Sequence, residues 1–158
     1  MIDLFSLLKE EVALPTIITP KITIQQILEW SLKESYSRLG ASSIYRSSSK
    51  TIIVRYSQYY NRPDENYWFA TTSNDLERVN KYSITHFAFV CVEKGVVLIP
   101  KGTMLEAIQK DNLNKTTTKQ GELRHYHIHF NEKNNSLNWR LKTENRPINN
   151  LFYPLSVT

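Results

Sequence analysis

The feature that most constrains the fold is a nearly continuous apolar run, THFAFVCV, at residues 85–92. A strand with one face in water alternates polar and apolar side chains, whereas this run is apolar at both parities. It is therefore expected to be a strand buried on both faces. The turn at Lys94-Gly95 and the run VVLIP at residues 96–100 predict that the chain returns as another strand.

The clearest helix is predicted at residues 24–39, where apolar side chains recur at helical spacing. Thr23 and Gln26 have the spacing of a capping box at its start, and Gly40 stands at the usual C′ position. A shorter helix is predicted at residues 3–12, followed by a connector that contains two prolines.

Short strands and two further helices account for the rest of the chain. Ser73 is the expected cap of a helix at 74–82, and Thr103 with Glu106 the expected capping box of a helix ending near 110. Residues 110–122 are polar and are expected to form a mobile loop. Besides the two strands named above, strands are predicted at 43–46, 51–60, 67–72, 124–131 and 136–142, the last two joined by a turn at Asn134-Asn135.

This order of elements predicts an α+β or α/β fold with a mixed sheet, built as an αβββαβ core with a C-terminal β-α-β-β extension. The 158 residues are the size of one domain. We expect that domain to comprise an N-terminal helix and connector (1–20), the core (21–100), a helix, loop and hairpin (101–146), and a C-terminal tail (147–158).

The charge of the chain is unevenly distributed. The net charge is +5, and residues 94–158 hold all of the excess, with 10 basic and 5 acidic residues. Within the neutral remainder, residues 35–63 contain five basic side chains and no acidic one. Such a stretch attracts phosphate backbones or anionic membranes, or is simply a solvated surface.

The sequence predicts a cytoplasmic protein. The N-terminus carries charges where a signal peptide would be apolar, and no apolar run reaches the roughly 18 residues of a membrane span. The single cysteine, Cys91, has no partner for an intrachain disulfide, which fits a reducing compartment. No motif for a cofactor or for a nucleophile elbow occurs, and neither a cofactor nor a catalytic residue is predicted.

Three of the four histidines alternate in the segment RHYHIHFNE, at His125, His127 and His129. In a strand they share one face, opposite a core face formed by Tyr126, Ile128 and Phe130. Three histidines in a line cannot converge on one metal ion without a further ligand, and no metal-binding motif accompanies them. Their face is expected to point outward, toward water or toward a nucleic acid.

Two other features of the sequence favour contact with nucleic acid. Arg55 lies in the middle of the most strand-like segment, where it can be a surface arginine or a rigidly presented phosphate ligand. The turn segment at 58–68 surrounds Arg62 with Tyr59, Tyr60, Tyr67 and Trp68. These aromatic side chains can stack on bases or fold back as cross-strand pairs.

Residues 24–100 resemble the PD-(D/E)XK nuclease-like group, whose core is αβββαβ. The resemblance rests on the pattern IIVRYSQ...NYWFATTSNDLERV...ITHFAFVCVEKGVVLIP. Where that family has its catalytic (D/E)xK motif, this chain has Ile53-Val54-Arg55, and the preceding segment ASSIYRSSSK has no aspartate. The resemblance therefore implies the fold of a nuclease without an intact magnesium site.

The leading hypothesis is a catalytically inactive DNA-recognition domain of a restriction or other defence system. One alternative is a metal-dependent nuclease with a relocated acid, at Glu29, Asp64 or Asp75. Another is a protein-interaction subunit that uses residues 110–122 and 148–157, or a piece of a longer chain. The predicted nucleic-acid contacts are Arg46, Lys50, Arg55, Tyr59, Tyr60, Arg62, Trp68, Lys101, His125, His127 and His129.

Overall fold

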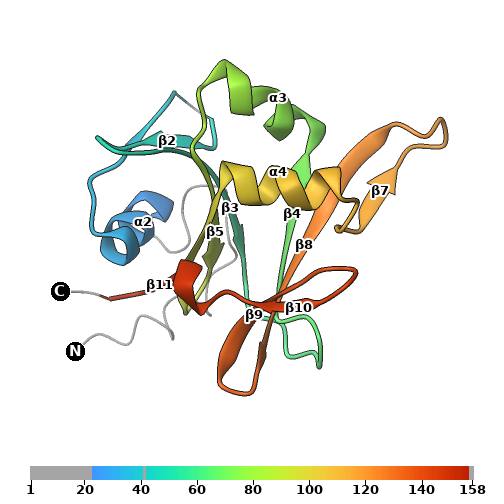
Figure 1. Cartoon of the computed structure of the whole chain (residues 1–158). Coiled ribbons are helices and arrows are strands. Elements are labelled where there is room, and N and C mark those ends of the chain that lie inside the picture. The colour runs from blue at the N-terminus through green and yellow to red at the C-terminus, as the bar shows by residue number, and fades with distance from the viewer. Residues whose placement is uncertain (1–22, 41, 157–158) are drawn as a thin grey trace.

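Two β-sheets pack against each other in the computed structural model, which describes residues 23–40 and 42–156 (Figure 1). Helices cover the remaining sides, so the predicted α+β class with a mixed sheet is confirmed. The helix predicted at 3–12 and its connector lie outside the described residues. Within the described part of the chain, no helix is both long and apolar enough to cross a membrane.

The larger sheet has six strands in the order β1-β2-β3-β5-β6-β11. β3 and β5 are parallel, and every other neighbouring pair is antiparallel. The predicted αβββαβ order is present along the chain, but its third strand, β4, belongs to the smaller sheet, and the short strand β1 precedes the first predicted strand. The strands are β1 (Ser37–Arg38), β2 (Ile44–Arg46), β3 (Thr51–Ser57), β5 (His86–Cys91), β6 (Gly95–Pro100) and β11 (Phe152–Pro154).

Helix α2 (Ile24–Leu32) covers one face of this sheet. Its Ile24, Ile27 and Leu28 are at most 2% exposed and pack on apolar side chains of β3, β5 and β6. The other face of the six-stranded sheet contacts the smaller sheet. β5 is thus buried on both faces, as its apolar run predicts.

The smaller sheet has five strands, all antiparallel, with β10, β9, β8 and β4 in that order and β7 also paired to β8. β8 and β9 join through Asn134 and Asn135, which both have positive φ, as the predicted two-residue turn requires. The strands are β4 (Tyr67–Thr72), β7 (Lys115–Thr117), β8 (Leu123–Lys133), β9 (Ser136–Arg140) and β10 (Asn145–Pro147).

The main core lies between the two sheets. Phe69 of β4, Phe89 of β5 and Phe130 of β8 meet there with ring centroids 5.0–5.8 Å apart. Helices α3 (Ser73–Lys81) and α4 (Lys101–Gln109) close this core from the sides (Figure 1). A short 3-10 helix, η1 (Asn149–Leu151), leads into β11.

The first helix is shorter than the sequence pattern predicts. It ends at Leu32 rather than at residue 39, because Lys33 adopts a left-handed conformation with φ 59°. The Glu29 carboxylate then accepts a hydrogen bond from the backbone N–H of Tyr36, at 2.8 Å. The chain continues in an extended conformation into β1, and Tyr36 is buried against α2 from outside the helix.

Two predicted caps are also wrong. α3 is capped by Thr72, not Ser73, in a reciprocal capping box with Asp75. α4 starts at Lys101 directly after β6, so no capping box forms with Thr103. The reason is the antiparallel return of β6, which brings the Lys101 N–H to 2.9 Å from the Thr85 carbonyl.

Four short strands had no sequence prediction. β1 lies where the end of the first helix was expected, β7 lies inside the segment expected to be a loop, and β10 and β11 lie in the C-terminal region. All four are too short and too polar or proline-rich to show a period-2 pattern. They form because a longer neighbouring strand supplies hydrogen-bond partners.

Candidate nucleic-acid interface

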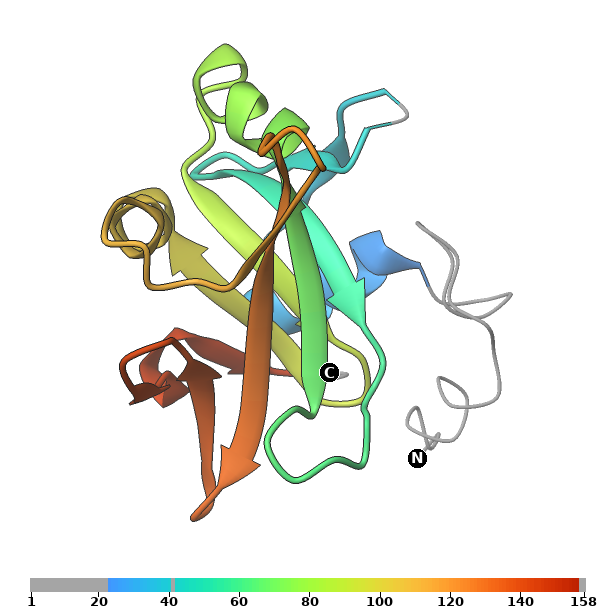
Figure 2. The same cartoon turned by 90° about the vertical axis from the view of Figure 1, so that its right-hand side faces the viewer.

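β4 and β8 lie side by side in the five-stranded sheet (Figure 2). The outer face of this sheet carries an organised set of aromatic and imidazole side chains. Along β4 the residues of one parity, Tyr67, Phe69 and Thr71, are buried in the core, and those of the other parity are half-buried. Directly opposite residues of antiparallel strands share a face. We use "histidine face" for Trp68, Ala70 and Thr72 of β4 with His129, His127 and His125 of β8, which oppose them in that order.

The three histidines lie in one row, as their alternation predicts. The ring centroids of His125 and His127 are 4.7 Å apart, and those of His127 and His129 are 5.8 Å apart with the planes within 3°. Behind them, Ile128 and Phe130 are fully buried and Tyr126 packs at the edge of the core. The histidines themselves are half-buried rather than freely exposed.

His127 is held by two hydrogen bonds. Trp68 donates from Nε1 to His127 Nδ1 at 3.0 Å, and His127 Nε2 lies 2.7 Å from the Thr116 hydroxyl of β7. Because Nδ1 accepts, a neutral ring carries its proton on Nε2 and donates it to Thr116. Burial lowers the pKa of His127, and the neighbouring His125 lowers it further. The neutral His127 ring therefore links Trp68 to Thr116 of β7 through two hydrogen bonds.

At the other end of the row, His129 lies among charged groups. Arg140 of β9 is its cross-strand neighbour, and Glu65 Oε2 is 3.6 Å from His129 Nδ1. Burial lowers the pKa of His129, whereas Glu65 raises it. Arg140 is exposed and so adds a positive charge to the histidine face.

A cleft of about 390 Å³ opens beside the histidine face, where β3 and the segment after it diverge from β4. Trp68, Ala70 and Thr72 line both the cleft and the histidine face, so the two form one continuous surface. The opposite wall of the cleft consists of Arg55, Tyr56, Ser57, Gln58 and Tyr60.

Arg55 does not stand free, as a phosphate ligand would. Its guanidinium forms an ion pair with the Asp75 carboxylate of α3, which is 1% exposed, and donates to the Val54 carbonyl. Asp75 also accepts from the Thr72 N–H and is 3.7 Å from Arg78. Arg55 therefore neutralises a buried carboxylate and ties β3 to α3, while its side chain, 26% exposed, lines the cleft.

The turn segment after β3 is organised around the buried side chain of Asn66. Its amide donates to the carbonyls of Tyr60 and Arg62 and accepts from the N–H of Glu132. Tyr59 folds back in an edge contact with the buried Tyr67, with ring centroids 5.7 Å apart, and remains 39% exposed.

Arg62 lies in the same turn segment, and it is the most exposed of the nucleic-acid contacts predicted there. Its guanidinium lies 5.3 Å from the ring centroid of Tyr60, and its side chain is 62% exposed. The two side chains form a cation–π pair at the rim of the cleft.

Three predicted contacts, Arg46, Lys50 and Lys101, are not brought to this surface. They lie at the opposite end of the six-stranded sheet, where Arg46 pairs with Thr51 in register and the Lys101 N–H donates to Thr85. Lys50 is engaged there by Glu34, with Nζ 3.0 Å from the carboxylate. The predicted nucleic-acid contacts thus divide into a continuous group around the histidine face and a separate group at the opposite end of the six-stranded sheet.

Sequence reasoning missed Gln58, Thr72, Thr116 and Arg140 as members of this surface. The position of Arg140 could have been predicted, because counting outward from a two-residue turn at Asn134-Asn135 pairs Arg140 with His129. Gln58, Thr72 and Thr116 have no comparable signal, since their positions depend on how β3, β4 and β7 approach one another.

The acids named for a relocated nuclease site each have another role. Glu29 binds the Tyr36 N–H on the α2 side, Asp64 pairs with Lys133, and Asp75 pairs with Arg55. Among the described residues, no three His, Cys, Asp or Glu side chains are grouped so that they could hold a metal ion.

Comparison of the chain with protein-family models, curated proteins and solved structures finds no match.

Proposed function

We propose that this protein is a nucleic-acid-recognition domain, with DNA as its ligand, that binds through the histidine face and the adjoining cleft. The observation that carries the proposal is the row of Trp68, His127 and His129, half-buried rings held in place on a rigid sheet. Bases that are turned out of a nucleic-acid strand can stack on such rings with little dependence on nucleotide sequence.

The hydrogen bonds of His127 support this function because they fix the rings of Trp68 and His127 before a ligand arrives. Trp68 is tied to His127 through Nε1, and its ring lies 5.6 Å from the ring of His127. A preorganised surface loses less conformational entropy on binding than a flexible one. Trp68 also lines the cleft, so a base stacked on its ring would lie next to the cleft.

Positive charge around the surface suits a phosphate backbone. Arg62 and Arg140 are exposed at its rim, and Arg55 lines the cleft. In this arrangement the rim arginines contact phosphates and the rings contact bases. Arg55 contributes to the cleft wall and to the position of α3 rather than acting as a mobile phosphate ligand.

DNA is proposed over RNA because of the resemblance of residues 24–100 to the nuclease-like group, with no catalytic role in this chain. A role in a restriction or other defence system follows from the same resemblance. The buried, free Cys91 suits a reducing compartment, and on this ground we propose a cytoplasmic location.

The test is fluorescence anisotropy with labelled single-stranded and duplex DNA at low and moderate salt. We expect salt-sensitive binding, and a loss of roughly 5- to 150-fold for Trp68→Ala, since stacking on one aromatic ring contributes about 1–3 kcal/mol. Trp68→Phe keeps a stacking ring but loses the bond to His127, and it should retain most of the affinity.

Tyr153→Ala is the matched control. Tyr153 is another aromatic side chain, 39% exposed, but it lies on β11 at the edge of the other sheet. Equal losses for Trp68→Ala and Tyr153→Ala would contradict a specific surface. Absence of binding at low salt, despite the net charge of +5, would overturn the proposed function.

A further inference from the structure

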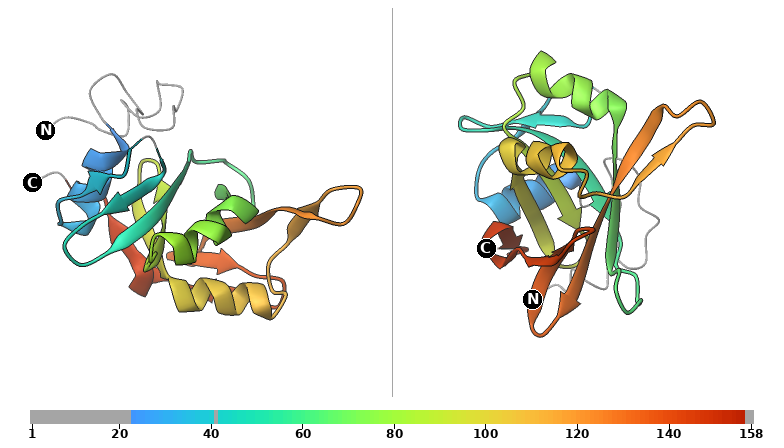
Figure 3. Two further views of the ribbon diagram at one scale, coloured as in Figure 1. Left: turned by 90° about the horizontal axis from the view of Figure 1, so that it is seen from above. Right: turned by 45° about the vertical axis from the view of Figure 1, so that its right-hand side comes forward.

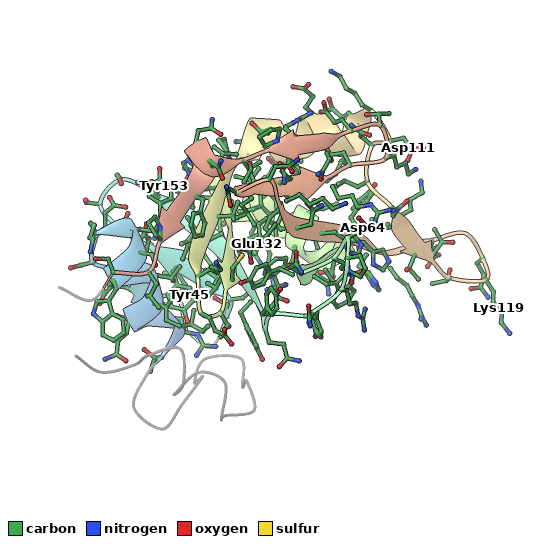
Figure 4. All side chains as sticks on the ribbon, turned by 90° about the horizontal axis from the view of Figure 1, so that it is seen from below. Tyr45, Asp64, Asp111, Lys119, Glu132 and Tyr153 are labelled. Atoms are coloured by element: carbon green, nitrogen blue, oxygen red, sulfur yellow. The ribbon has the colours of Figure 1, made fainter. Side chains whose placement is uncertain are left out.

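A two-stranded arm extends away from the two packed sheets. We define the arm as residues 114–126, which comprise β7, the turn after it and the first part of β8. Figures 1 and 3 show it projecting beyond the body, and Figure 4 places Lys119 at its far end. β8 is the only strand described here that pairs with β7, and no side chain of residues 115–124 is buried.

The arm is ordered by hydrogen bonds of its own. The Thr118 N–H donates to the Glu122 carbonyl at 2.8 Å, and the Gly121 N–H donates to the Thr118 carbonyl at 3.0 Å. The Thr118 hydroxyl accepts from the Glu122 N–H at 3.1 Å, and Gly121 has the positive φ of 83° that the turn requires. At its base, Thr116 is fixed by His127. The arm therefore has a defined shape without burying an apolar face.

The side chains of the arm are mainly basic and polar. Residues 114–124 contain three basic residues, Lys115, Lys119 and Arg124, against one acid, Glu122, together with three consecutive threonines. Lys115 lies 3.9 Å from Asp111, but within the described residues neither Lys119 nor Arg124 forms an ion pair. Hydroxyl and amide groups at the turn add hydrogen-bond donors and acceptors that can reach base edges.

We infer that the arm enters the major groove of a B-form DNA duplex. Its two strands lie roughly 4.8 Å apart and the B-DNA major groove is about 12 Å wide, so the groove admits such a ribbon. The major groove of A-form RNA is too narrow and deep for one, which makes duplex DNA the matching ligand. This inference rests on the proposed function and names its ligand as a duplex.

The arm and the histidine face are parts of one rigid element. β8 runs without interruption from Leu123 in the arm to Lys133, and His125, His127 and His129 lie along it. A duplex held by the arm would therefore be presented at a fixed angle to the rings. Groove contact by the arm and base contact at the rings would then occur on the same DNA molecule.

The test compares the wild-type chain with the double variant Lys119→Ala/Arg124→Ala. Each phosphate contact adds about 0.9 to the slope of log affinity against log salt, so the slope for duplex DNA should fall by about 2. Affinity for duplex DNA should fall at least roughly tenfold at moderate salt. Affinity for single-stranded DNA, which relies on the rings, should change much less.

The control is Lys33→Ala/Lys94→Ala, which removes the same formal charge next to β11, where Lys33 donates to the Ser156 carbonyl and the Lys94 carbonyl accepts from the Leu155 N–H. β11 and the arm lie on opposite sides of the molecule (Figure 1). An equal effect of both double variants would overturn the inference, because only net charge would matter. Two other results would also overturn the inference. The first is that the Lys119→Ala/Arg124→Ala variant loses as much affinity for an RNA duplex as for a DNA duplex. The second is that poly-glutamate displaces duplex DNA from the wild-type protein as well as unlabelled DNA does. If wild-type protein binds no nucleic acid, the proposed function fails, whereas binding that ignores the arm overturns this inference alone.

Discussion

The two sheets of this protein differ in how their faces are covered. The six-stranded sheet packs α2 on one face and the five-stranded sheet on the other, so β5 buries Ala88 and Val90 on one side and Phe87 and Phe89 on the other. Among the described residues, the five-stranded sheet buries only its inner face. Its outer face bears half-buried rings with hydrogen bonds among them.

This difference separates stability from ligand contact. In the six-stranded sheet each side chain of β5 is constrained by packing, which leaves no free face for binding. In the five-stranded sheet one face contributes to the core while the other positions Trp68 and the histidines. A change on one face of β8 should therefore affect folding, and a change on the other should affect binding.

The largest effect is expected for Phe130→Ala. Phe130 is fully buried against Phe69 and Phe89, and removing a buried phenyl ring costs about 3–5 kcal/mol. His129→Ala, one residue away on the outer face, should cost about 1 kcal/mol or less. Urea unfolding of both variants measures the difference, and similar losses would contradict the division between the two faces.

The next effect concerns the ion pair between β3 and α3. Arg55→Ala leaves the Asp75 carboxylate buried with only Arg78, at 3.7 Å, to balance it. Removing one partner of a buried pair costs about 3–5 kcal/mol, and the partial exposure of Arg55 places this case near 3. Urea unfolding measures this loss of stability. A partly unfolded Arg55→Ala variant would also bind DNA weakly, so its stability must be measured before its affinity is interpreted.

The double variant Arg55→Ala/Asp75→Asn supplies the control. Asparagine removes the charge but can still accept the hydrogen bond from the Thr72 N–H that caps α3. It should recover much of the stability lost in Arg55→Ala. A double variant as unstable as the single one would show that Arg55 acts through packing instead.

The smallest effect is a pH dependence that arises on the outer face. The pKa of His127 is lowered in the folded protein, so the unfolded chain binds more protons near pH 6. His127 therefore contributes full stability above its unfolded pKa of about 6.5, and that contribution is lost as the pH falls below this value. Protonation also removes the acceptor for Trp68.

His127→Gln should show a smaller loss of stability than wild type when the pH of urea unfolding is lowered from about 7.5 to about 5.5. A residual loss should remain, because burial also lowers the pKa of His86 and His129. An unchanged pH dependence in His127→Gln would contradict the lowered pKa of His127 in the folded protein.

Several parts of the fold were predictable because they depend on local patterns. The apolar run at 85–92 indicated a strand buried on both faces, and the alternation at 124–131 separated the core side of β8 from the histidines. The Asn134-Asn135 turn set the register of the hairpin, since its two residues tolerate positive φ. Each of these signals spans fewer than a dozen residues.

The failures have a common physical origin. The apolar spacing in residues 24–39 fits a helix throughout, but Lys33 ends it and Glu29 captures the Tyr36 N–H. Tyr36 reaches the same core from an extended segment, so its burial does not require helical geometry. Arg55 was interpreted as a phosphate ligand because its partner, Asp75, is twenty residues away in the chain.

The sequence alone determined which side chains share a face, because the two-residue period of a strand and the geometry of a tight turn are local properties. It therefore placed the three histidines in a row opposite the core. Only the tertiary structure decided what each side chain meets there. Trp68 reaches His127, Thr116 closes the base of the arm, and Asp75 engages Arg55 because strands distant in sequence are brought together by burial of the core between the sheets.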